Sequence, residues 1–389
     1  MWSGRFLWGL LVFRFSVIED GKSGEQAMSN RVPPVKLTLT RGRHNVLGAD
    51  RAAGSGPEHM TNKRAPLRGT GFSPKEVLFA SMTDCNLNCA HCSVERGKAR
   101  LPIPAAVKFL RSCRKAGVER VGFTGGEPFL DIEFLHAVTE FAVAHGFLFG
   151  LVTTNAAWFR SAAHLRRTLK ELFDRGYDGS FGVSVDAFHG KDPAKPALFI
   201  ETARKIWNRP DVARVIAVKG ARDKETEAVL KALAGALKAK LVAVGGHRVI
   251  RNDSLFVPVM MIDLAPVGKA ESLLDPWGKE WFKEDFCRGP GHVFYVLPNG
   301  DVKPCCGYAT DSERLTIGNI HKDTAAKMLE NASRNPFVSA VFEIGLSRVR
   351  ARLERQGVVF PGATTNPCYF CHHVLTKVPQ NISVVKRSQ

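Results

Sequence analysis

Three cysteines fall within one short segment, Cys85-Asn-Leu-Asn-Cys89-Ala-His-Cys92. Thiolates at this spacing are close enough for a single loop to wrap one metal centre. A closed structural zinc site takes four ligands, whereas a [4Fe–4S] cluster held by three cysteines keeps one iron open to a ligand that is not protein. The triplet therefore favours an iron–sulfur cluster over zinc, with His91 packing beside the ligands.

A second, dispersed group of four cysteines lies in the last third of the chain: Cys287, Cys305, Cys368 and Cys371. Seven of the nine cysteines thus fall into two groups, a distribution that indicates metal binding. The odd count and the lack of a convincing secretory signal favour a reducing compartment, where clustered cysteines are more often metal ligands than disulfides. We therefore expect a cytoplasmic protein.

Short β-type segments alternate with amphipathic helical stretches from Lys75 onward. The predicted strands are residues 76–81, 120–124, 147–153, 179–185, 214–218 and 255–263. The predicted helices are residues 104–116, 132–145, 162–175, 197–207 and 226–238. Because strand–helix repeats build parallel sheets, the expected fold class is α/β, a partial (β/α)6 TIM-like barrel. Phe109, Phe134 and Trp207 are expected in its core, and Cys113 is expected to be buried.

Unusual residues follow four successive predicted strands. The cysteine triplet follows the first strand, Gly125-Gly126-Glu127-Pro128 the second, Asn155 the third and Asp186 the fourth. Reactive groups of parallel barrels lie at the carboxyl ends of the strands, so these residues are expected to surround one site. Glycines let a backbone approach a ligand closely, and a carboxylate suits an ammonium group.

The spacing of three and then two residues between Cys85, Cys89 and Cys92 resembles the radical S-adenosylmethionine (radical SAM) superfamily. The resemblance implies that the open iron of the cluster chelates S-adenosylmethionine (SAM), whose cleavage gives a 5′-deoxyadenosyl radical that abstracts hydrogen from a substrate. Gly125-Gly126-Glu127-Pro128 is similar to the family motif that hydrogen-bonds the amino group of SAM.

Further cofactor contacts are implied by the same resemblance at Asn155, Ser184 and Asp186. The alternative is that Asn155 or the Ser184–Asp186 segment only satisfies a strand end. The segment Pro266-Val267-Gly268-Lys269-Ala270 looks like the turn after the sixth strand in the family. An arginine is common there in place of Lys269, so a cofactor contact at this turn stays open.

The dispersed cysteines resemble the SPASM auxiliary-cluster domain. Asn299-Gly300-Asp301 is expected to turn a hairpin that brings two cysteines together, and Ile317-Gly318-Asn319-Ile320 is similar to the segment that follows this hairpin. A full SPASM domain carries seven cysteines and two extra clusters, so this shorter set is closer to the truncated form called a twitch domain.

The ligands implied for one auxiliary [4Fe–4S] cluster are Cys287, Cys305, Cys368 and Cys371. A zinc ribbon built from the same four residues is the alternative, and Cys306 is an alternative to Cys305. His372 and His373, which follow the last cysteine, are expected to be solvent-facing or to support the ligands.

The chain of 389 residues carries a net charge of +18, which favours an anionic partner or simply reflects solvated faces. No run of like charge is long enough for a nucleic-acid arm. Residues 1–74 are predicted to be a disordered or mis-annotated extension, with Met28 and Met60 as possible starts. Arg14 interrupts the apolar run near the start, so no membrane span is expected.

Two further units are expected, a radical SAM core at residues 75–270 and an auxiliary cluster domain with a tail at residues 271–389. The implied function is an oxidoreductase-type radical SAM enzyme that modifies a peptide or protein, with flavodoxin or ferredoxin as electron donor. The alternatives are radical modification or cyclisation of a small molecule or nucleotide in cofactor biosynthesis, as in the molybdenum-cofactor cyclase, and a non-catalytic iron–sulfur or zinc protein.

Overall fold

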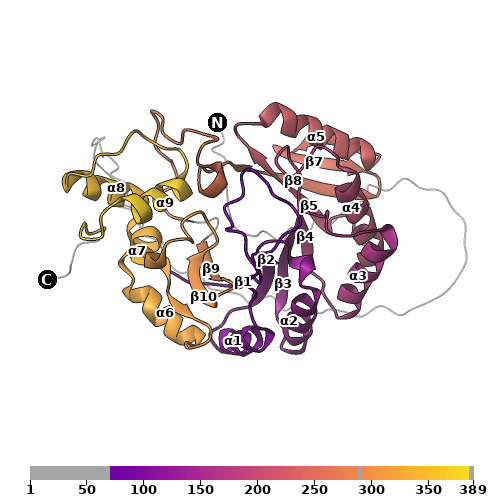
Figure 1. Cartoon of the computed structure of the whole chain (residues 1–389), viewed down its shortest axis with the longest axis horizontal. Helices are drawn as coiled ribbons and strands as arrows, with labels where there is room; N and C mark the ends of the chain where they lie inside the picture. The colour runs from indigo at the N-terminus through magenta and orange to yellow at the C-terminus, as the bar shows by residue number, and fades with distance from the viewer. Residues whose placement is uncertain (1–70, 288–290, 385–389) are drawn as a thin grey trace, which may run out of the picture. The chain divides into compact units, whose positions relative to one another are not determined.

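The computed structural model describes residues 71–287 and 291–384 (Figure 1). The predicted N-terminal extension, including Met28 and Met60, lies almost entirely outside the described residues. Among the residues described, no helix combines the length and the apolar content that a bilayer crossing requires.

Six parallel strands form the centre of the sheet in the order β1-β2-β3-β4-β5-β8, each adjacent to the next. Their bounds are β1 Glu76–Ala80, β2 Arg120–Thr124, β3 Leu148–Thr154, β4 Ser180–Ser184, β5 Ala213–Lys219 and β8 Leu255–Asp263. The helices that connect them are α1 Ile103–Lys115, α2 Ile132–Ala144, α3 Ala162–Asp174, α4 Ala194–Trp207 and α5 Asp223–Ala236. This arrangement confirms the predicted α/β fold with a partial (β/α)6 barrel.

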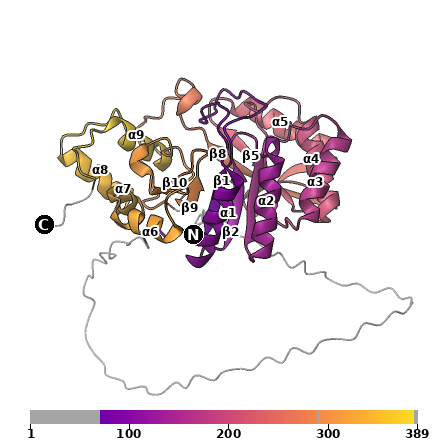
Figure 2. The same ribbon diagram turned by 60° about the horizontal axis from the view of Figure 1, so that its bottom comes forward.

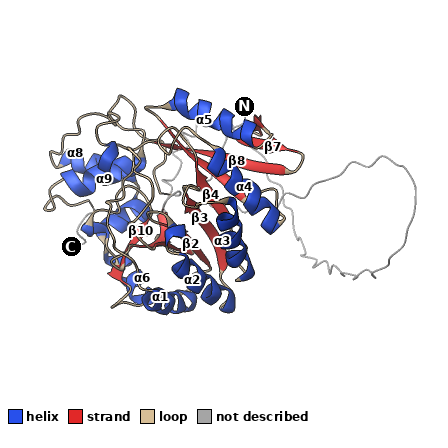
Figure 3. Ribbon diagram, turned by 45° about the vertical axis from the view of Figure 1, so that its right-hand side comes forward, coloured by secondary structure: helices blue, strands red, loops and turns tan. Residues whose placement is uncertain are grey.

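Each connecting helix buries one face against the sheet. On α1 the buried residues are Ala106, Phe109, Leu110 and Cys113, spaced as on one face of a helix. Phe134 on α2 and Trp207 at the end of α4 are also buried, so the predicted core positions are confirmed. Figure 3 shows α2, α3 and α4 covering the outer face of the sheet. Burial of these apolar faces is the main favourable contribution to this layer.

An antiparallel hairpin precedes the last barrel strand, and the sequence analysis missed it. Strands β6 Lys240–Val244 and β7 His247–Asn252 pair with each other, and β7 pairs with β8. Gly245 and Gly246 form the turn with φ of +56° and +81°. Two positive φ values match the tight turns that twist with a hairpin, so the Gly-Gly pair was an available signal.

The C-terminal part joins the same sheet at its other edge. Strand β9, Gly291–Val296, pairs in parallel with β1, and β10, Asp301–Cys305, returns antiparallel beside β9 (Figure 2). Gly300 occupies the turn with φ of +86°, so the predicted hairpin is confirmed. Strands from both sides of residue 270 belong to one sheet. The predicted boundary between two domains at residue 270 therefore stays a prediction.

The remaining C-terminal elements are mostly helical. They are β11 Gly318–Asn319, α6 Ala325–Arg334, α7 Pro336–Ser339, a π-helical turn Ala340–Ile344, α8 Leu346–Arg355 and α9 Pro367–Lys377, with short 3₁₀ turns at Pro128–Leu130, Gly268–Ala270 and Glu313–Leu315. Helix α9 matters most for the site because Cys368 and Cys371 lie on it.

Candidate functional site

The cysteine triplet lies in the loop that follows β1, at the carboxyl end of the barrel strands. Cys85, Cys89 and Cys92 are all partly exposed. The amide of Cys92 donates to the Cys89 carbonyl at 3.2 Å, and the Arg96 guanidinium donates to the Cys85 carbonyl at 2.8 Å. Burial, followed by the thiols of Cys92 and Cys85, raises the pKa of Cys89 to about 11. Thiols this close fit one metal centre, which would deprotonate them on binding.

Two glycines bring the end of β2 directly against the start of this loop. The Gly126 amide donates to the Met82 carbonyl at 2.8 Å, and the Glu127 amide donates to the Asp84 carbonyl at 2.9 Å. A Cβ on Gly126 would overlap the Asp84 carbonyl oxygen. Gly125 has φ of +125°, and its Cβ would lie 2.7 Å from the Met82 oxygen. The glycines therefore let two backbones meet, besides any approach to a ligand.

The carboxylate of Glu127 is completely buried and binds protein groups. Its oxygens accept from the Thr154 hydroxyl at 2.8 Å, the Asn155 amide at 2.8 Å and the Phe129 amide at 3.2 Å. Burial outweighs these bonds and raises its pKa to about 7. In this structure the carboxylate therefore joins the ends of β2 and β3, and Gly125 and Gly126 are the partly exposed part of the motif. Contact of the motif with SAM stays a prediction.

Asn155 connects the end of β3 to the cysteine loop. Its side-chain amide donates to Asn86 Oδ1 at 2.9 Å and lies 3.5 Å from Cys85 Sγ. Its Oδ1 accepts from the Ala157 amide at 2.8 Å. The side chain therefore contacts the triplet, as its place after the third strand predicted, and its contact with SAM stays a prediction.

Asp186 repeats the arrangement of Glu127 at the next pair of strands. It is fully buried and accepts from the amides of Phe188, His189 and Val218 at 2.9, 3.1 and 3.1 Å, and from His189 Nδ1 at 2.9 Å. Burial alone would raise its pKa, but the His189 side chain and the Val218 amide lower it overall. In this structure Asp186 therefore links β4 and β5, while Ser184 is partly exposed at the end of β4. Contact of either side chain with SAM stays a prediction.

His91 and His189 form a ring contact that sequence reasoning did not identify. Their ring centroids lie 4.9 Å apart, and the His91 ring also lies 4.8 Å from that of Phe188. Burial, followed by the charge of His189, lowers the pKa of His91 to about 4. The donor atoms of both histidines and Asp186 lie within 4.8 Å of one another, but the four hydrogen bonds to Asp186 leave it poorly suited to bind a metal.

The turn after β8 closes the other side of the cysteine loop. The Lys269 amide donates to the Cys92 carbonyl at 3.3 Å, and its ammonium group contacts Asn88 Oδ1. A Cβ on Gly268 would lie 3.0 Å from Ser93 Cα. Lys269 therefore supports the loop in this structure, and a lysine performs this role where the family often has arginine.

The dispersed cysteines converge in the C-terminal part. Burial is the largest cause that raises the pKa of Cys287, Cys368 and Cys371, and neighbouring cysteine thiols are the next. Burial also raises the pKa of Cys305, where the Gly307 amide and Lys303 act in the opposite direction. Helix α9 presents Cys368 and Cys371 one turn apart, and Asn366 caps its first turn through the Tyr369 amide at 3.0 Å. Neighbouring cysteines contribute at Cys287, Cys368 and Cys371, which indicates that these three and Cys305 lie near one another. Four cysteines that converge in this way fit a cluster or zinc, since either metal centre binds thiolates.

Cys306 is exposed as a whole residue, although its thiol is buried. Burial, then Cys305, Glu76 and Cys287, raise the pKa of this thiol, so it lies near the same group. It therefore remains the alternative to Cys305. Among the contacts of the described residues, His372 has no hydrogen bond to a cysteine. Its Nδ1 lies 3.0 Å from the Tyr308 carbonyl oxygen. His373 packs against Trp277, with ring centroids 4.8 Å apart.

We expect Gly126→Ala to displace the cysteine loop, because its Cβ has no room beside the Asp84 carbonyl. The variant should lose most of the iron bound by the triplet and roughly 2–4 kcal/mol of unfolding free energy. Iron analysis and anaerobic urea unfolding measure both. Gly235→Ala on α5 is the matched control, since nothing lies within 4 Å and alanine favours a helix. Full iron binding by Gly126→Ala would contradict the packing argument.

The stability contribution of Glu127 should fall as pH rises. Its pKa is raised from 4.5 to about 7, so the contribution is present below pH 4.5 and is lost towards pH 7. Between pH 5.5 and 8, the wild type should lose about 2 kcal/mol of its unfolding free energy relative to Glu127→Gln. Urea unfolding at the two pH values measures this, with the exposed Glu133→Gln as control. Parallel pH profiles for wild type and Glu127→Gln would refute the assignment.

Two family models match the chain. Residues 80–253 match the radical SAM superfamily, and residues 287–346 match the SPASM iron–sulfur cluster-binding domain. The first match contains the cysteine triplet and all four strand-end features. The second contains Cys287, Cys305 and Cys306, whereas Cys368 and Cys371 lie beyond it.

Two curated relatives each match about two thirds of the chain. A GTP 3′,8-cyclase of Limosilactobacillus fermentum is 24% identical over 280 residues, which is 67% of this chain and 75% of the relative. The putative peptide biosynthesis protein YydG of Bacillus subtilis is 21% identical over 277 residues, 67% of this chain and 78% of the relative.

Among solved structures, anSMEcpe with bound AdoMet and the Cp18Cys peptide has a TM-score of 0.48 and 16% identity, over 72% of this chain and 87% of that one. Streptococcus suis SuiB has a TM-score of 0.45 and 18% identity, over 69% and 68%. From its two family matches, the chain belongs to the radical SAM superfamily and carries a SPASM domain, which together imply a [4Fe–4S] cluster, an auxiliary cluster and SAM as cofactors.

Proposed function

We propose that this chain is a radical SAM enzyme of the oxidoreductase type that modifies a peptide or protein. The observation that carries the proposal is the cysteine loop, which contacts the end of β2, the end of β3 and the turn after β8. When bound there, a reduced [4Fe–4S] cluster supplies the electron that cleaves SAM to a 5′-deoxyadenosyl radical for hydrogen abstraction.

The chain's own residues have three tasks in this proposal. Cys85, Cys89 and Cys92 hold the cluster as thiolates. The partly exposed Gly125-Gly126 backbone and Ser184 lie at the strand ends where SAM would bind, and Asn155 orients the loop through Asn86 and Cys85. Glu127, Pro128 and Asp186 belong to the same motifs but act by fixing the strand ends, because all three are buried.

The C-terminal cysteines supply a second centre in this proposal. Cys287, Cys305, Cys368 and Cys371 would hold the auxiliary cluster, which would supply an electron acceptor or a group that orients the substrate. A low-potential donor such as flavodoxin or ferredoxin would reduce the chain. The core at residues 75–270 and the auxiliary part at residues 271–389 would then work as one unit, since β9 pairs with β1.

A peptide substrate is supported by the relative named as a putative peptide biosynthesis protein, which matches 67% of this chain. A nucleotide substrate is the second candidate, because relatives named GTP 3′,8-cyclase match an equal share of the chain. Incubating the reduced enzyme and SAM with GTP, or with the product of a neighbouring precursor-peptide gene, separates the two by the mass of the product.

Anaerobic reconstitution should give about eight irons per chain and 5′-deoxyadenosine when dithionite and SAM are added. Cys85→Ala, Cys89→Ala and Cys92→Ala should each reduce deoxyadenosine to background, because the cluster loses one of three ligands. Cys113→Ala is the control, since this buried cysteine on α1 belongs to neither group. Deoxyadenosine formation by any of the three triplet variants would overturn the proposal, and zinc in place of iron would favour a non-catalytic protein.

The auxiliary assignment predicts a different result for the other cysteines. Cys371→Ala should lower the iron content from about eight to about four while deoxyadenosine formation without substrate persists. Cys306→Ala should leave about eight irons, as it lies outside the proposed ligand set. If Cys306→Ala lost iron and Cys305→Ala kept it, Cys306 would be the ligand. Iron analysis and electron paramagnetic resonance distinguish these results.

A further inference from the structure

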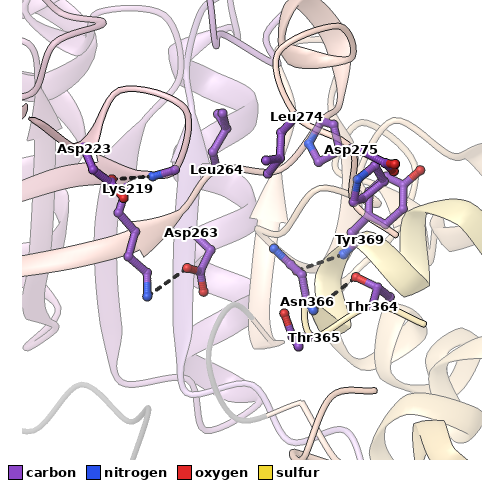
Figure 4. Close-up of a pocket in the computed structure, with 13 residues that line it drawn as sticks. Lys219, Asp223, Asp263, Leu264, Leu274, Asp275, Thr364, Thr365, Asn366 and Tyr369 are labelled. Carbon is purple, nitrogen blue, oxygen red and sulfur yellow. Dashed lines mark hydrogen bonds and ion pairs between the residues drawn. The ribbon is translucent and has the colours of Figure 1, made fainter. Parts of the chain in front are cut away.

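A pocket of about 350 Å³ opens where the barrel meets the auxiliary part (Figure 4). On the barrel side its lining includes Lys219 at the end of β5, Asp223 at the start of α5 and Asp263 at the end of β8. On the other side Asp275 and Tyr369 face it, so both parts of the chain contribute to one cavity.

The pocket borders elements that carry both cysteine groups. Its barrel wall continues through Pro266 to the turn at Gly268, which packs against Ser93 beside the cysteine triplet. Its other wall includes the first turn of α9, where the lining residue Tyr369 directly follows Cys368.

Acidic side chains outnumber basic ones in the lining, with Asp223, Asp263 and Asp275 against Lys219. The Lys219 ammonium pairs with Asp263 Oδ1 at 2.9 Å. The Gly220 amide donates to Asp223 Oδ1 at 2.6 Å, and the Trp277 amide donates to Asp275 Oδ1 at 3.0 Å. Among the described contacts each carboxylate thus uses Oδ1 alone, and its Oδ2 is available to a ligand.

Three carboxylates against one ammonium give the pocket a local negative charge. A negative potential disfavours the phosphates of a nucleotide and favours a cation.

Two aromatic rings that lie outside the pocket lining continue from Tyr369 along the surface. Ring centroids lie 5.5 Å apart for Tyr369 and Trp277, and 6.3 Å apart for Trp277 and Phe360. All three rings are partly exposed. Such a surface suits apolar side chains next to a charged one, which is a feature of a peptide rather than of a small free amine.

We propose that this pocket receives a lysine or arginine side chain of the peptide substrate, with Asp263 and Asp275 as its specificity-determining residues. The proposal rests on the peptide-modifying function above and adds the chemical class of the residue that is recognised. Lys219 limits the selectivity, because its ammonium competes with the substrate cation for Asp263.

Anaerobic fluorescence anisotropy with the reconstituted enzyme and SAM tests the proposal. The probes are three fluorescein-labelled peptides, Ala-Leu-X-Leu-Ala, in which X is Lys, Met or Glu. We expect the Lys peptide to bind roughly five- to tenfold more tightly than the Glu peptide. Asp263→Asn and Asp275→Asn should each lower this ratio about threefold, and Lys219→Gln should raise it. Asp253→Asn, in the exposed β7–β8 turn, is the matched control and should leave it unchanged.

The inference is overturned if the Glu peptide, or GTP as competitor, binds as tightly as the Lys peptide, or if the ratio is the same in all pocket variants. Iron content equal to that of the wild type verifies that a variant is folded. Binding does not require SAM cleavage, so the two proposals fail separately. Charge-selective binding without deoxyadenosine formation would contradict only the proposed function, and deoxyadenosine formation without charge selectivity would contradict only this inference.

Discussion

The site depends on one close backbone approach, in which Gly125 and Gly126 at the end of β2 lie against the chain from Met82 to Asp84. Two amide–carbonyl hydrogen bonds join these segments, and no side chain fits between them. Because Asp84 immediately precedes Cys85, this contact sets where the cysteine loop begins. The rest of the loop can then reach Asn155 on one side and the turn after β8 on the other. Glycine here is a requirement of packing, not only of turn geometry.

Two buried carboxylates keep neighbouring strand ends together around this loop. Removing a carboxylate from water is costly, and only hydrogen bonds to the charged oxygens offset the cost. Asp186 accepts four such bonds and keeps a low pKa, whereas Glu127 accepts three and has a raised one. Both side chains belong to motifs that resemble the SAM-binding motifs of the family. In this structure their hydrogen bonds connect neighbouring strand ends. A motif residue therefore needs its burial known before it is assigned to ligand binding.

The predicted barrel strands and helices agree closely with the structure, because alternating β segments and amphipathic helices leave a local periodic signal. The strand-end position of each motif followed from that. The β6–β7 hairpin was missed although Gly245-Gly246 was a local turn signal. The role of Glu127 depends on Thr154 and Asn155, which lie far along the chain on another strand. Contacts of this kind follow from strand order and register, which single-sequence reasoning does not provide.

The parallel pairing of β9 with β1 also links the two cysteine groups mechanically. The triplet follows β1, and Cys287 precedes β9, so both groups are anchored to adjacent strands of one sheet. A large opening between the barrel and the auxiliary part would break the hydrogen bonds between β9 and β1. Access to the pocket is therefore determined by its lining residues. The net charge of +18 attracts anions to the surface in general, but salt screens this field over roughly 10 Å. Within the pocket, the nearby carboxylates of Asp223, Asp263 and Asp275 act on a ligand more strongly than this distant positive charge. The net charge of the protein and the charge of its substrate therefore need not have opposite signs.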